Sequence, residues 1–169
     1  GSAANAVAIG FNAGVASGGQ NVAVGYQAGQ VTQGLGGIAI GFGAAINNQG
    51  AGGVAVGYNA STGAFQGVNA IAIGNNAAGD IANSQGGAAV AIGFQAGYTS
   101  QGVSAIAIGE DAGNTTQSQG AVAIGDAAGN ITQGQDAVAI GTSAGLTNQG
   151  QDAVAVGKDA GTTNQANGA

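Results

Sequence analysis

The residues best suited to chemistry are the acidic side chains, most of which lie toward the C-terminus. Six of the seven are Glu110, Asp111, Asp126, Asp136, Asp152 and Asp159. Paired carboxylates can act as a general acid and base or bind a cation. The chain has no histidine, no cysteine and no Gly-Gly-x-Gly-x-Asp repeat of the calcium-binding type. We therefore expect ordinary solvated acids, with no catalytic residues, no metal site and no cofactor.

A second candidate site is formed by aromatic residues that each follow a recurring glycine. Five of the seven aromatics in the chain have this position, namely Phe11, Tyr26, Phe42, Tyr58 and Phe94. A row of exposed rings would form a ridge suited to stacking against sugar rings or to contacting a partner protein. The alternative interpretation is an aromatic stack that caps the core or packs between subunits. The sequence leaves both interpretations open.

These residues recur because the chain repeats one short unit ten times. Each unit has a core of Val or Ile, then Ala, then Ile or Val, then Gly, and the closing glycines are Gly10, Gly25, Gly41, Gly57, Gly74, Gly93, Gly109, Gly125, Gly141 and Gly157. Most successive glycines are 16 residues apart. An alanine lies two residues before and three residues after every one of them, and most units have a glutamine eight residues after it.

This unit predicts an all-β parallel solenoid with about ten coils of 16 residues. Helices are excluded because each interior glycine costs about 1 kcal/mol in a helix and every unit has two or three. We expect the glycines to form tight corners and the glutamines to form an amide ladder between coils. Longer spacings between Gly57 and Gly93 predict bulged corners near residues 62–67 and 79–87.

The predicted domain organisation is a single repeat domain over residues 5–165. Residues 1–4 are interpreted as a tag or N-terminal extension, because Gly1-Ser2 resembles a cloning remnant, and residues 166–169 as a C-terminal tail. Three Asn-x-Ser/Thr sequences, at Asn59, Asn114 and Asn130, would matter only in a secretory pathway.

The predicted strand is apolar on both faces, since alanines alternate with Val or Ile. One face can fill the narrow interior of the coil, which leaves the other to meet something outside. Lateral association, around a symmetry axis for example, would bury that second face. The alternative is that an alanine face simply tolerates solvent.

The charge balance narrows the range of partners. One basic residue, Lys158, stands against seven acids, and the net charge of −6 would repel nucleic acid and anionic membrane surfaces. No apolar run approaches the roughly 20 residues that a membrane-spanning helix needs. We therefore expect no nucleic-acid partner and no direct membrane insertion.

The Ala-Val-Ala-Ile-Gly cores followed by Ala-Gly resemble the YadA-like head repeats of trimeric autotransporter adhesins, and similar repeats occur in viral and phage fibre proteins. The resemblance covers residues 5–165 and implies a left-handed β-roll, a homotrimer, and an extracellular place on a bacterial cell surface or virion fibre. It also implies that the Val and Ile residues form the roll core and the subunit contacts. These residues are Val7, Ile9, Val22, Val24, Ile38, Ile40, Ile71, Ile73, Ile106, Ile108, Val122, Ile124, Val138 and Ile140. The period of 16 is longer than is usual for that family, and glutamine-glycine pairs replace its serine-rich turns.

The repeat pattern and the resemblance lead to three hypotheses for the function, none of them enzymatic. The first is attachment of a head or fibre segment to a host cell, a matrix protein or a glycan. The second is ice binding by a flat, uncharged β-face, although the column of Thr32, Thr116 and Thr132 is interrupted by Asn and Ser. The third is a structural fibre spacer without a ligand.

Overall fold

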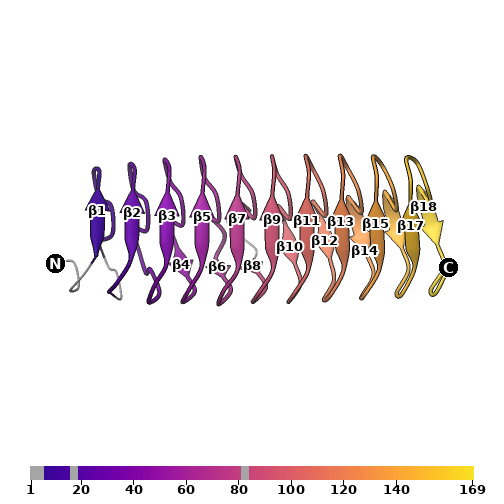
Figure 1. The fold of residues 1–169 in the computed structure, drawn as a ribbon, viewed down its shortest axis with the longest axis horizontal. Coiled ribbons are helices and arrows are strands. Elements are labelled where there is room, and N and C mark those ends of the chain that lie inside the picture. Colours follow the sequence, from indigo (N-terminus) through magenta and orange to yellow (C-terminus); the bar gives the residue numbers. More distant parts are fainter. Residues whose placement is uncertain (1–5, 16–18, 81–83) are drawn as a thin grey trace.

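The computed structural model describes residues 6–15, 19–80 and 84–169 and shows an all-β parallel solenoid of about ten coils (Figure 1). The coils follow one another along a straight rod, with the N-terminus at one end and the C-terminus at the other. The predicted fold class is confirmed. No helix occurs in the described ranges.

Ten strands form the first sheet, one from each apolar core. They are β1 (Val7–Ile9), β2 (Val22–Val24), β3 (Ile38–Ile40), β5 (Val54–Val56), β7 (Ile71–Ile73), β9 (Val90–Ile92), β11 (Ile106–Ile108), β13 (Val122–Ile124), β15 (Val138–Ile140) and β17 (Val154–Val156). All neighbouring pairs are parallel, and alanine always pairs with alanine, as Ala107 does with Ala123. Residues at the same position in successive repeats therefore lie in one column along the rod.

The second sheet has eight strands of two or three residues, and all of them end on the glutamine column. They are β4 (Asn48–Gln49), β6 (Phe65–Gln66), β8 (Ser84–Gln85), β10 (Ser100–Gln101), β12 (Thr116–Gln117), β14 (Ile131–Gln133), β16 (Thr147–Gln149) and β18 (Thr163–Gln165). An isolated parallel bridge from Gln33 to Gln49 extends the column by one coil. Glutamine pairs with glutamine throughout, which fixes the register of the second sheet.

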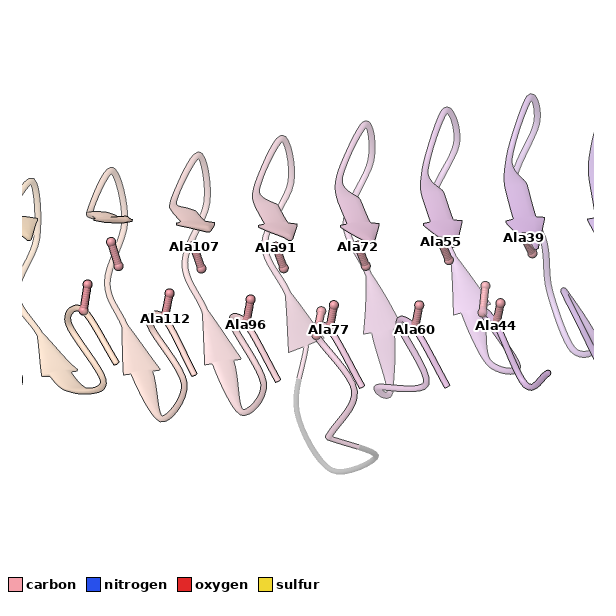
Figure 2. Packing of buried hydrophobic residues seen from close by; sticks show 14 of the residues in the cluster. Ala39, Ala44, Ala55, Ala60, Ala72, Ala77, Ala91, Ala96, Ala107 and Ala112 are labelled. Atoms are coloured by element: carbon pink, nitrogen blue, oxygen red, sulfur yellow. The ribbon is translucent and has the colours of Figure 1, made fainter. Parts of the chain in front are cut away.

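The core of the solenoid consists of alanine, and the larger aliphatic side chains point outward. The middle alanine of each strand from β3 to β15 is fully buried and faces the alanine that follows the corner, as Ala55 faces Ala60 (Figure 2). The flanking Val and Ile side chains are half-buried or exposed, and the exposed fraction is 38% at Ile40 and 61% at Ile9. The expectation that Val and Ile fill the roll core is thus wrong. Two facing alanine layers leave the interior too narrow for branched side chains.

The rest of the interior is filled by the glutamine column, which forms the predicted amide ladder. From Gln66 to Gln133, each side-chain Nε2 donates to the Oε1 of the next glutamine over 3.1–3.3 Å, so the ladder ends at the Oε1 of Gln149. Each Nε2 also donates to a Val or Ile carbonyl of the first sheet over 2.6–2.9 Å. These bonds connect the two sheets within a coil and connect neighbouring coils, which satisfies most of the buried amide groups.

The glycine that ends each strand of the first sheet is required by close packing along the axis. Gly25 and Gly41 have φ values of +134° and +131°. A Cβ on Gly25 would collide with the carbonyl oxygen of Gly41, and the same relation holds between Gly41 and Gly57. Any other residue here would separate two coils, because the colliding atoms belong to the backbone.

The extra residues of the longer repeats lie at one corner of the coil. Gly57 and Gln66 are nine residues apart instead of eight, so the extra residue lies within the predicted 62–67 corner, where the Thr62 hydroxyl donates to the Gly79 carbonyl over 2.6 Å. The second predicted bulge, 79–87, is described except for residues 81–83. At the C-terminus, the Val154 amide donates to the Ala169 carbonyl over 2.8 Å, so residues 166–169 form the turn of the last coil. The proposed tag at residues 1–4 lies outside the described ranges.

Candidate binding surfaces

The first four aromatic residues of the column are stacked on one another and exposed. Their ring centroids are 5.4 Å apart between Phe11 and Tyr26, 4.9 Å between Tyr26 and Phe42, and 5.3 Å between Phe42 and Tyr58, with interplanar angles of 10–15°. Between 42% and 65% of each residue is exposed. The column therefore does not cap the core. We call these four residues the aromatic column.

Backbone hydrogen bonds hold the aromatic column in register. The carbonyl of each aromatic residue accepts an amide hydrogen from the next coil: Phe11 from Gln27 over 2.8 Å, Tyr26 from Gly43 over 2.9 Å and Phe42 from Asn59 over 2.8 Å. The ring spacing thus follows from the coil spacing of about 4.8 Å. The rings do not have to be ordered when something binds to them.

The fifth aromatic residue, Phe94, stands apart. It is 44% exposed and occupies the same position in its coil, but its neighbours along the column are Asn75 and Glu110. The sequence pattern placed all five residues in one column, and the structure separates four stacked rings from a single one. Asn75 is the residue that ends the stack.

A second exposed apolar column was not recognised from the sequence. Leu35, Val68 and Val103, each more than half exposed, lie two residues after the buried glutamines. Backbone bonds place Ala51 and Gly87 in the same column, and beyond Val103 it continues as Gln119, Gln135 and Gln151. The signal was available in the sequence, because this column changes from apolar to polar near the coil in which the aromatic positions become acidic.

The charged side chains all lie beyond residue 79. Residues 1–79 contain no acidic or basic residue, and the first acid is Asp80. In the part of the chain that the structure describes, no three acidic side chains come together as a metal site would require, and no pocket is present. The side chain of Asp111 accepts a hydrogen bond from Asn114 Nδ2 over 2.9 Å.

The asparagines of the three Asn-x-Ser/Thr sequences take part in the coil structure. Asn114 Nδ2 also donates to the Gln95 carbonyl over 3.3 Å, and Asn130 Nδ2 donates to the Asp111 carbonyl over 2.9 Å. At Asn59 the side-chain oxygen lies where it would collide with a Cβ added to Gly43 of the preceding coil. The amides of Asn114 and Asn130 are therefore occupied in bonds between coils.

The outward face of the first sheet is an apolar surface that runs along the rod. It carries two rows of Val and Ile along ten parallel strands, and the exposed fraction is 37% at Ile73 and 53% at Val154. We call it the Val/Ile face. The structure brings all fourteen Val and Ile residues named from the sequence onto this one face, although it does so outside the core.

Comparison with known proteins identifies no relative: no family model, no curated protein and no solved structure matches the chain. Residues 6–15, 19–80 and 84–169 form no helix that is long and apolar enough to cross a membrane.

Proposed function

We propose that this chain is a non-enzymatic segment of an extracellular attachment fibre, carried on a bacterial cell or a virion. Copies of the chain associate as a homotrimer through the Val/Ile face. The coils of the N-terminal half present their exposed rings and aliphatic side chains to a host cell, a matrix protein or a glycan. The observation that carries this proposal is the Val/Ile face, which runs unbroken along ten strands.

The physical reason is the size and continuity of that face. Isolated exposed apolar residues are normal on a soluble protein, but contiguous apolar patches of more than a few hundred Å² mark interaction sites. The face also belongs to a parallel sheet, and such sheets are usually covered on both sides. The opposite side of this sheet is already covered by the second alanine layer and the glutamine ladder.

Absolute mass in solution, measured by light scattering during size-exclusion chromatography, tests the association. We expect three times the 15.5 kDa mass of the chain. Replacing Ile124 and Ile140 with serine should shift the protein toward monomer, because both side chains are exposed on the Val/Ile face. Ile131→Ser is the matched control, since Ile131 is similarly exposed but lies on the second sheet.

Two results would overturn the association. A wild-type monomer would mean that the Val/Ile face meets solvent or a ligand. A trimer that survives the double substitution but dissociates with Ile131→Ser would place the contact on the second sheet.

Binding to cells, immobilised matrix proteins and a glycan array tests the attachment. A chain that assembles but binds none of these would be a structural fibre spacer.

A further inference from the structure

We propose that the aromatic column is a binding site for a planar, elongated, conjugated aromatic molecule that lies flat across the ring edges, parallel to the rod axis. The inference rests on the proposed function in one respect, which is that the aromatic column faces a ligand and is not covered by another subunit. It specifies the chemistry of what the column recognises.

The first argument concerns which parts of the rings are available. Tyr26 and Phe42 each have a ring stacked on both sides, at centroid separations of 4.9–5.4 Å. Their faces are therefore covered by the neighbouring rings, although 42% and 47% of these residues is exposed. What the interior rings offer to solvent is their edges.

The second argument concerns the ligand that suits such edges. The edge of an aromatic ring is electropositive and its face is electronegative, so edge-to-face contact is favourable. A planar π-system laid along the aromatic column can make this contact with four successive rings. A sugar packs its C–H groups against ring faces, and in the interior of the column these faces are already occupied. The geometry therefore favours an aromatic ligand over a pyranose.

The third argument concerns length and rigidity. The stack ends where Asn75 follows Tyr58, so the site spans four coils, or roughly 14 Å. This length suits a rod-shaped molecule with two or three linked rings. Backbone hydrogen bonds of 2.8–2.9 Å between coils hold the rings in register before any ligand arrives. Preorganisation of this kind reduces the entropy lost on binding.

The fourth argument concerns charge. No acidic or basic side chain occurs in residues 1–79, which include all four rings. Recognition by the aromatic column is therefore not ionic, and affinity should change little with salt. A cation attracted instead to the acids of the C-terminal coils would be released as salt screens them.

Thioflavin T is a suitable probe, because it is planar, rod-shaped and fluorescent when immobilised. We expect one dye site per chain in titrations of the assembled protein at high salt. Replacing Tyr26 and Phe42 together with leucine keeps apolar side chains but removes the interior rings. This double variant should bind roughly tenfold more weakly or worse, since two edge-to-face contacts are lost.

The matched control is Phe94→Leu, which removes an aromatic residue of similar exposure from the same position in the coil but outside the stack. It should bind the dye as the wild type does, and so should Tyr26→Phe, which retains the stack. Equal dye affinity in the double leucine variant would overturn the inference. So would loss of dye binding at high salt, which would assign the dye to the acidic coils.

Light scattering on the same samples separates this inference from the proposed function. If the double leucine variant dissociates into monomers, the aromatic column is a subunit contact and the inference is wrong. If the wild type is a monomer that binds the dye at the aromatic column, the inference stands and the proposed association fails.

Discussion

Nε2 of Gln117 lies 3.1 Å from Oε1 of Gln133, the glutamine one coil further along the rod. The same nitrogen donates to the Ile106 carbonyl over 2.6 Å and to the Ala121 carbonyl over 3.1 Å. One buried amide thus connects two coils and both sides of a coil. Only a side chain with donor hydrogens and an acceptor oxygen can do this, so the position requires an amide.

Replacing Gln117 with glutamate should therefore destabilise the solenoid strongly. The shape is preserved, but an ionised carboxylate has no hydrogen to donate and would face two carbonyl oxygens in a buried site. We expect a loss of roughly 3–5 kcal/mol in the free energy of unfolding at neutral pH. Chemical denaturation followed by circular dichroism measures it.

Gln119→Glu is the control for this substitution. Gln119 lies two residues further on and is exposed. The charge added there is the same, so its effect should stay within about 0.5 kcal/mol. Equal losses at the two positions would mean that added charge, and not the buried amide, sets the stability.

Enlarging a core alanine should also destabilise the fold. Ala55 is fully buried between alanine layers, and Ala55→Leu should cost at least about 2 kcal/mol through overpacking. Ala51 belongs to the same coil but is exposed, and Ala51→Leu should be tolerated, because Leu35 occupies that column in the preceding coil. Thermal melting of the two variants makes the comparison. A tolerated leucine at position 55 would contradict the alanine core.

Adding a methyl group at Gly25 should break the stacking of coils. The new Cβ would collide with the Gly41 carbonyl at a φ of +134°. Gly36→Ala is the control, since Gly36 also has positive φ, at +70°, but has open space around its Cβ position. We expect about 1 kcal/mol of destabilisation at Gly36. At Gly25 the chain should fail to form a cooperative solenoid, and a cooperative melt there would refute the close approach of the coils.

The second sheet should not bind ice. Thr116 and Thr132 are exposed on it, but the column continues with Asn148 and Asn164. Thr132, Asn148 and Asn164 all have positive φ, which interrupts the extended backbone of a flat face. We expect no inhibition of ice recrystallisation. Inhibition at micromolar protein would instead favour ice binding as the function.

The sequence predicted the coil, the corners and the amide ladder because each follows from one residue type in a fixed position. It did not predict which strand face points inward, because both faces are apolar and periodicity alone is symmetrical between them. Size could have decided it: the position of Ala55 never varies, whereas Val and Ile exchange freely on either side. An invariant small residue is typical of a narrow interior.

The aromatic residues were placed in one column for the same reason, since position in the repeat fixes position in space. The length of the stack depends on where a non-aromatic residue interrupts the column. The sequence already has Asn75 between Tyr58 and Phe94 in this column, and the register between strands confirms that Asn75 occupies the position of a ring. The periodicity of one chain does not determine whether another subunit covers a face.

The corner between Gly57 and Gln66 accommodates an extra residue, and this tolerance affects how the number of coils can change in evolution. Each coil contacts only its two neighbours, and alignment between coils comes from matching columns. Unequal recombination between the DNA segments that encode two repeats would thus yield a longer or shorter rod that still folds. The length of the rod would then change in steps of one coil, without any change in the residues within a coil.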